Sequence, residues 1–295
     1  MMLSEREVSI KIKNIRGRQI IDSRGNPTCE ADIILDSDIL GRGAVPSGAS
    51  TGTLEALELR DNDPDRYLGK SVSSAIDKIN NEISSKLIYI TFTQESFDKF
   101  LIDLDGTDNK ERLGANTILS LSIAFANAKA KNQNVPLYQS LTDETSYMMP
   151  IPMMNIINGG AHANNKLDFQ EFMILPVGFD KITESIRAGA EIFHTLKNTL
   201  NRLNMPTSVG DEGGFAPNLD TNSQAINIII EAISDAGYKP GENVYLGLDV
   251  ASSEFYKDGI YTLKSENLNL KSDEFIDYLC NLRRNYPIIS IEDGL

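Results

Sequence analysis

The sequence has little cysteine and histidine and no tryptophan, and this limits the chemistry it can support. Its 295 residues include two cysteines and two histidines. Cys29 and Cys280 lie far apart and belong to no CxxC motif or Cys/His cluster, which argues against a disulfide framework or a zinc site. We expect both to be buried, unreactive thiols.

Long apolar runs are also missing. No stretch approaches the ~18 apolar residues that a membrane-spanning helix needs, and the charged N-terminal segment contains no apolar core of a signal peptide. With 41% hydrophobic and 24% charged residues, the composition is that of a globular protein. We expect no membrane span and a cytoplasmic location.

Positive charge is in short supply. The chain has 28 Lys and Arg against 42 Asp and Glu, a formal net charge of −14. This argues against nucleic acid or an anionic membrane surface as the main partner, because both require basic patches. A small anionic substrate would need a local reversal of sign, which bound divalent cations can supply where carboxylates line a site.

The first part of the chain combines strands with a block of helices. Residues 8–15 alternate apolar and polar side chains, as a half-buried strand does, and 28–35 form a second strand candidate. The Gly/Ser-rich segment 46–52 has the composition of a loop. Apolar side chains at helical spacing predict helices over 71–87, 94–104 and 115–132. The sequence therefore predicts an α+β domain over residues 1–140.

From about residue 145 to 295 the pattern changes to short apolar runs that alternate with helical stretches. Such an alternation is typical of a parallel β/α structure, and it predicts a second domain that is an incomplete α/β (TIM-like) barrel. The AspGly dipeptide at 258–259 predicts an inserted hairpin. The predicted strands are 151–157, 172–175, 244–248 and 288–291, and the predicted helices are 181–204, 223–236 and 272–284.

Two of these predicted strands end in acids, Asp249 and Glu292. The C-terminal ends of the strands hold the active site in a parallel β/α barrel, so carboxylates there would converge. Hard cations such as magnesium prefer these oxygen ligands. An acid just after a strand can also simply cap the next helix or face solvent.

Two glycine-rich loops carry further candidates. GlyAspGluGlyGlyPheAlaProAsn (210–218) contains Glu212, and a carboxyl near other acids or away from water can have its pKa raised enough to act as a general acid. An acidic surface turn is the alternative. AsnGlyGlyAlaHis places His162 in a loop among glycines, where binding is as reasonable as a purely structural role.

Ser50 suggests a rival enzyme class. GlyAlaSerThrGly (48–52) fits the GxSxG pattern of serine hydrolases, but that nucleophile needs a strand leading directly into a sharp turn and a helix. Pro46, Ser47 and Gly48 precede this serine instead. With two histidines in the chain, the choice of a catalytic base is also narrow.

The ordered set of motifs resembles the enolases. AspSerArgGlyAsnPro, ValProSerGlyAlaSerThrGly, AsnGlyGlyAlaHis, GlnGluPheMet, GlyAspGluGlyGlyPheAlaProAsn, GlyLeuAspValAlaSerSerGluPhe and SerIleGluAspGly occur in the order that they take in that family. The resemblance extends from about residue 8 to 295. It implies a magnesium-dependent glycolytic lyase that reversibly dehydrates 2-phosphoglycerate to phosphoenolpyruvate, and a homodimeric full-length protein.

The resemblance also implies roles for single residues. Asp249 and Glu292 match two of three carboxylates that hold the first magnesium, and Ser50 matches a loop residue that helps to bind the second. Glu212 resembles the general acid for loss of the C3 hydroxyl. Glu171 matches the partner of that acid, and Gln170 matches a substrate contact. His162 matches a residue of the loop that closes over the substrate phosphate.

The family pattern continues past SerIleGluAspGly through a third metal-binding Asp, the catalytic-base Lys, a His-Arg-Ser segment and another Lys. None of these follows Leu295, so we expect a C-terminally truncated chain that is inactive alone. The rival from another class is a non-catalytic enolase-like fragment that acts as an interaction module.

Overall fold

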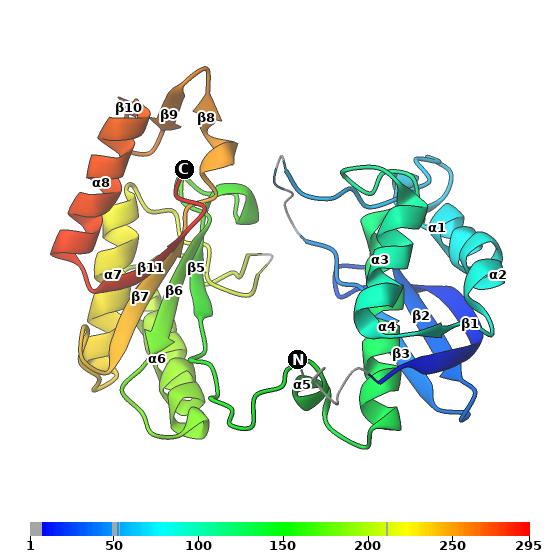
Figure 1. Cartoon of the computed structure of the whole chain (residues 1–295). Coiled ribbons are helices and arrows are strands. Elements are labelled where there is room, and N and C mark those ends of the chain that lie inside the picture. The colour runs from blue at the N-terminus through cyan, green and yellow to red at the C-terminus, as the bar shows by residue number, and fades with distance from the viewer. Residues whose placement is uncertain (1–7, 49–51, 53, 211) are drawn as a thin grey trace. The chain divides into compact units, whose positions relative to one another are not determined.

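A computed structural model describes residues 8–48, 52, 54–210 and 212–295. The chain divides into two compact units, the first extending to Tyr147 and the second beginning at Met148. Figure 1 shows that each unit combines a sheet with helices. Within the described residues, every helix is too short or too polar to cross a bilayer.

The first unit is built on an antiparallel sheet with the strand order β3-β2-β1-β4. The alternating segment predicted as a strand forms the start of β1, which continues to Ile21 beyond the predicted end. The strand β3 was not predicted, because two of its five residues are glycines and give no apolar signal. The strands are β1 (Ile10–Ile21), β2 (Pro27–Leu35), β3 (Leu40–Ala44) and β4 (Thr91–Phe92).

Helices cover the apolar face of this sheet, and the three predicted helical regions are all helical. Thr93 begins α3 with a capping box, in which its side chain accepts from the Ser96 N–H and the Ser96 hydroxyl accepts from the Thr93 N–H. The helices are α1 (Ser73–Asp77), α2 (Ser84–Leu87), α3 (Gln94–Asp105), α4 (Ala115–Asn132) and α5 (Leu137–Ser140); π-helix η2 (Lys78–Ile83) joins α1 to α2, and the 3-10 turn η1 is Tyr67–Gly69.

The glycines of β3 allow α4 to rest directly on the strand backbone. A Cβ on Gly41 would lie 2.1 Å from the carbonyl oxygen of Ala124, and one on Gly43 would lie 2.3 Å from that of Ser120. Real Cβ atoms do not approach backbone so closely. Both positions therefore require glycine for packing.

The sheet of the second unit has the strand order β11-β7-β6-β5. Its core joins the sheet to α6, α7 and α8 and contains Phe172, Ile192, Ile229, Leu248 and Phe275. The strands are β5 (Met154–Asn158), β6 (Glu171–Pro176), β7 (Val244–Asp249) and β11 (Ile288–Glu292). The helices are α6 (Ile182–Arg202), α7 (Asn222–Asp235) and α8 (Ser272–Asn285), and two 3-10 turns are η3 (Gly160–His162) and η4 (Ser252–Glu254).

The expected all-parallel pattern is wrong for the start of this sheet. β5 and β6 pair antiparallel, as do β6 and β7, whereas β7 and β11 pair parallel. Residues 159–170 join β5 to β6 without a crossover helix, which a parallel pair would need. Between β6 and β7 the chain forms two helices, so α6 takes it back along the sheet and α7 returns it. β7 thus begins beside the end of β6, where Val244 pairs with Pro176.

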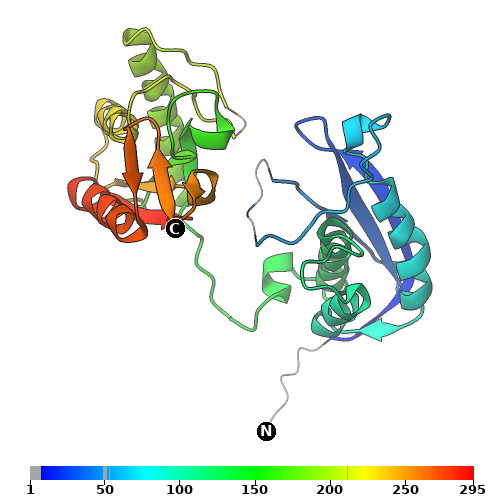
Figure 2. The ribbon, with the colours of Figure 1, turned by 90° about the horizontal axis from the view of Figure 1, so that it is seen from above.

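The predicted hairpin at 258–259 is confirmed. β8 (Tyr256–Lys257) and β9 (Ile260–Leu263) pair antiparallel around it, and β9 also pairs with β10 (Leu268–Leu270), which was not predicted. The orange strands of this small sheet can be followed by their colour in Figure 2. The expectation for the thiols holds for Cys29, which is buried, and is wrong for Cys280, which lies on the exposed face of α8.

Gly41→Ala should lower the free energy of unfolding of the first unit by about 1–3 kcal/mol, because the new methyl group meets the backbone of α4. Urea denaturation followed by a probe in the first unit measures this. Gly52→Ala is the matched control, since a Cβ there meets no atom of the described residues within 4 Å. Equal stability of the two variants would show that α4 does not rest on β3 as described.

Candidate active site

Three carboxylates lie side by side on neighbouring strands, at one end of the second sheet. Glu171 is the first residue of β6 and pairs with Asp249, the last residue of β7. Asp249 in turn pairs with Glu292, the last residue of β11. Side chains of directly paired residues point to the same face about 5 Å apart, so the three acids form a row. Because β6 runs antiparallel to β7, its first residue lies beside the last residue of β7. β11 runs parallel to β7, so its last residue lies on the other side of Asp249.

Burial and mutual repulsion raise the pKa values of these acids. The pKa of Glu171 rises from 4.5 to about 7, first because the carboxyl is buried and then because of the charges of Asp249, Glu212 and Glu292. Burial also raises the pKa of Asp249. Glu292 is an exposed residue, and the pKa of its carboxyl is raised by partial desolvation and by the charges of Asp249 and Asp293. Such a cluster favours a bound proton or a bound cation.

Donors from the chain hold Asp249 in place. The Gln170 side chain donates from Nε2 to Asp249 Oδ2 at 3.1 Å, and the Ala251 N–H donates to Oδ1 at 3.0 Å. The backbone N–H of Gln170 also donates to the Asp249 carbonyl at 3.1 Å. Gln170 Oε1 is buried without a hydrogen-bond partner among the described residues. It is therefore available to a ligand.

His162 lies beside this row. The residue is 7% exposed, and its Nδ1 is 3.3 Å from Glu171 Oε1. This is contact distance without the alignment of a hydrogen bond, so within the described part of the chain neither ring nitrogen has a hydrogen-bond partner. A buried polar group without a partner is costly, and a ligand that bonds to the imidazole would remove that cost.

The glycine-rich loop that carries Glu212 is fixed at both ends. The Gly210 N–H donates to the Gly214 carbonyl at 2.8 Å, and Gly213 has a φ of +84°, which glycine adopts without strain. Buried Asn158, at the end of β5, donates from Nδ2 to the Gly214 carbonyl at 3.0 Å. Glu212 is exposed on this loop, and its charge acts on Glu171.

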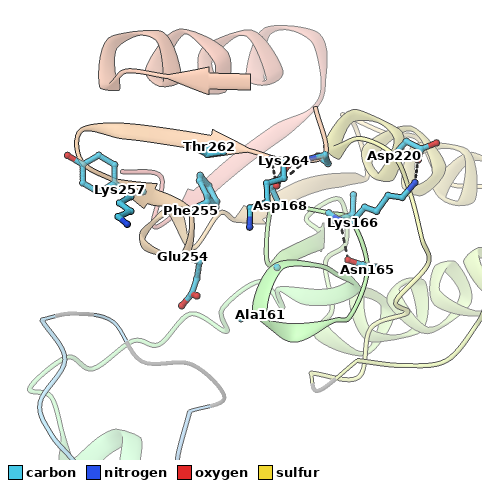
Figure 3. A pocket seen from close by; sticks show the side chains of 14 residues that line it. Ala161, Asn165, Lys166, Asp168, Asp220, Glu254, Phe255, Lys257, Thr262 and Lys264 are labelled. Atoms are coloured by element: carbon cyan, nitrogen blue, oxygen red, sulfur yellow. Dashed lines mark hydrogen bonds and ion pairs between the residues drawn. The ribbon is translucent and has the colours of Figure 1, made fainter. Parts of the chain in front are cut away.

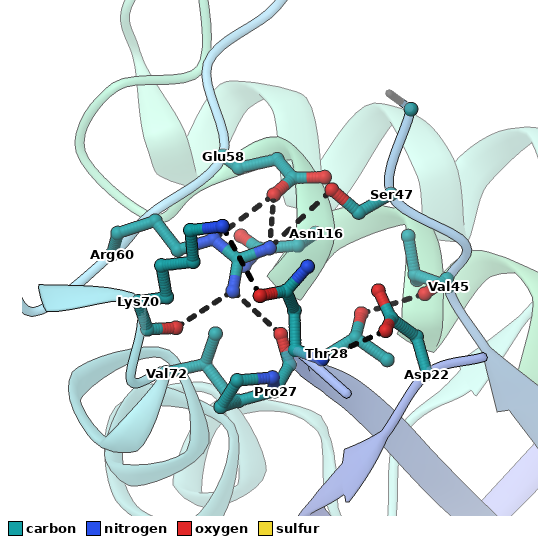
Figure 4. A network of polar contacts seen from close by, with 12 residues as sticks. Asp22, Pro27, Thr28, Val45, Ser47, Glu58, Arg60, Lys70, Val72 and Asn116 are labelled. Carbon is teal, nitrogen blue, oxygen red and sulfur yellow. Dashed lines mark hydrogen bonds and ion pairs between the residues drawn. The ribbon is translucent and has the colours of Figure 1, made fainter. Parts of the chain in front are cut away.

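Ser50 lies outside the described residues, so the structure does not test the serine-hydrolase alternative at this position. The loop leading to it is held by two arginines in the first unit. Arg24 donates to the carbonyls of Ser47 and Gly48, at 2.6 and 2.9 Å. As Figure 4 shows, Arg60 bonds to the carbonyls of Pro27 and Lys70, to Glu58 and to the Ser47 hydroxyl.

The residues at the sheet edge suit a hard divalent cation by their chemistry. Asp249 and Glu292 are neighbouring carboxylates whose repulsion such an ion would relieve. In the described ranges, no group of three His, Cys, Asp or Glu side chains is placed to hold a metal ion. Two neighbouring carboxylates are fewer ligands than such an ion takes, so Asp249 and Glu292 by themselves do not form a complete cation site in the described part of the chain.

Family comparisons cover both units of the chain. Residues 146–295 match the family described as the enolase C-terminal TIM barrel domain, and residues 12–141 match the enolase N-terminal domain. The class is thus that of lyases built from an α+β domain and a β/α barrel. The chain belongs to the enolase family.

Three residues near the site were not identified from the sequence. The negative charge of Asp293 raises the pKa values of Asp249 and Glu292, and its position next to Glu292 in the sequence could have indicated this. Asn158 fixes the loop of Glu212, and Asp168 bonds to a distant turn. Those roles depend on partners more than 50 residues away in sequence, so no local pattern indicates them.

Glu171→Gln should increase the free energy of unfolding by about 2–3 kcal/mol at pH 8 and change it little near pH 4.5. The folded chain keeps the Glu171 proton up to about pH 7, whereas the unfolded chain releases it near 4.5. Stability therefore falls as the pH rises through this window, and an amide removes the effect.

Urea denaturation at several pH values measures this difference. Glu144→Gln, which changes an exposed carboxyl in the same way, is the control. A Glu171→Gln difference that does not vary with pH would contradict the raised pKa.

Proposed function

We propose that these residues form the metal-binding and general-acid part of an enzyme that reversibly dehydrates 2-phosphoglycerate to phosphoenolpyruvate. The observation that supports this best is the row of Glu171, Asp249 and Glu292 beside His162 and Gln170. In the family, magnesium supplies the positive charge that stabilises the dianionic carboxylate formed when the C2 proton leaves. Asp249 and Glu292 would hold the first such ion, and Ser50 would help to hold a second.

The carboxylate pair then has a defined task in the proposal. Loss of the C3 hydroxyl as water requires a proton, which Glu212 would donate. Glu171 would be its partner, and the rise of the Glu171 pKa to about 7 by burial and neighbouring charges supports a proton-handling role for this pair. Buried His162 and Gln170 both offer unpaired polar atoms within the described structure, and we assign them to contacts with the substrate.

Removal of the C2 proton is assigned by family resemblance to a lysine in a segment that follows SerIleGluAspGly. We infer that turnover requires that lysine. The complete protein is expected to be a cytoplasmic homodimer. The alternative, a non-catalytic interaction module, would apply if the extended protein also lacked turnover.

In the protein extended by the rest of the barrel, Asp249→Ala should reduce magnesium-dependent conversion of 2-phosphoglycerate about 100-fold or more, because it removes one ligand of a unit that acts together. The measurement is formation of phosphoenolpyruvate against magnesium concentration. Asp220→Ala, a change of an exposed acid that pairs with Lys166, is the control. Conversion that persists in excess chelator would contradict the proposal.

Glu212→Gln in the same extended protein should stop dehydration while slow exchange of the C2 proton continues, since a different residue removes that proton. Exchange is followed by NMR in deuterated water and dehydration by absorbance. Proportional loss of both reactions would show that Glu212 is not the general acid.

A further inference from the structure

Asp168, three residues before β6, connects the active-site segment to a turn almost one hundred residues away. Its Oδ1 accepts from the Lys264 N–H at 2.8 Å, and its Oδ2 accepts from the Ser265 N–H at 3.1 Å and from the Ser265 hydroxyl. These residues lie in the turn between β9 and β10. Figure 3 shows Asp168 directed to the backbone at Lys264, on one side of a surface pocket.

Phe169, the next residue, is held from another direction. Its N–H donates to Oδ1 of Asn222 at 3.3 Å, and Asn222 is the fully buried first residue of α7. The Phe169 ring is itself completely buried and meets the ring of Tyr278 of α8 edge to face, with centroids 6.2 Å apart. Backbone and side chain of Phe169 are thus both fixed.

Glu266 joins these two attachments. Its Oε1 accepts from the Asn222 N–H at 3.0 Å and from the Tyr278 hydroxyl at 2.9 Å. Glu266 belongs to the same turn as Lys264 and Ser265. The β9–β10 turn therefore makes two attachments. Its backbone N–H groups bind Asp168, and its Glu266 carboxylate binds Asn222, the residue that accepts from the Phe169 N–H.

We propose that Asp168 and Glu266 are positioning residues, which use the β9–β10 turn to set the location of Gln170 and Glu171 at the carboxylate row. The geometry is direct, because Asp168 and Phe169 immediately precede Gln170, and Gln170 continues the ladder to Asp249. Hydrogen bonds that involve a charged group contribute more than neutral ones, and the Asp168 carboxylate accepts from three donors. The catalytic consequence rests on the function proposed above, whereas the structural coupling does not.

The test is amide hydrogen exchange by NMR on the 295-residue chain. Asp168→Asn places an amide donor against N–H donors, and Glu266→Ala removes the other attachment. Each should accelerate exchange of the Phe169 and Gln170 amides about tenfold or more relative to the Leu246 amide of β7, which bonds to the Pro287 carbonyl. Asp220→Asn is the control, because it removes an acid that lines the same pocket and whose partner is the exposed Lys166.

Equal acceleration of all three amides in both variants would overturn the proposal, because the contacts would then contribute only to global stability. No acceleration in either variant would also overturn it, because the contacts would then have no effect on this segment. In the extended protein, Asp168→Asn should lower kcat about tenfold with KM changed less than about twofold, at a temperature where it is fully folded. An unchanged kcat would equally reject a positioning role. An extended wild-type protein without turnover would reject the proposed function, and the exchange result would still decide the coupling.

Discussion

The antiparallel course of β6 is the constraint on which the site depends. A strand that begins beside the end of its neighbour brings Glu171 next to Asp249, and the parallel pairing of β7 with β11 adds Glu292. This direction follows from the connections, since two successive helices lie between β6 and β7 whereas α8 is the helix that returns the chain to β11. The loop after β5 then carries His162 to the same edge.

Bringing several acids together at a partly buried site is unfavourable unless protons, cations or donors compensate. The chain supplies donors to Asp249 from Gln170 and Ala251, and leaves Glu171 as the acid with the most strongly raised pKa of the row. Buried polar atoms of His162 and Gln170 have no hydrogen-bond partner among the described residues, and this adds to the free-energy cost of the site. Grouping these side chains therefore costs folding free energy that the donors of the chain offset only in part.

Much of this was predictable from the sequence, and the failures have physical causes. Periodicity identified the long helices and the central strands, and the acids at the ends of β7 and β11 were identified from their positions alone. Strand direction was wrong because apolar runs carry no information on it. β3 was missed because Gly41 and Gly43 serve close packing, a contact with α4 about 80 residues later. Asp168 and Asn158 act through equally distant partners.

The central claim is that these acids converge and share their charge, and carboxyl ¹³C NMR of Glu171 tests it most directly. The account predicts that the Glu171 carboxyl titrates near pH 7, and that Asp249→Asn lowers its pKa by removing one source of repulsion. A pKa close to 4.5 in the unmodified chain, unaffected by Asp249→Asn, would contradict it, because Glu171 would then be neither buried nor beside Asp249.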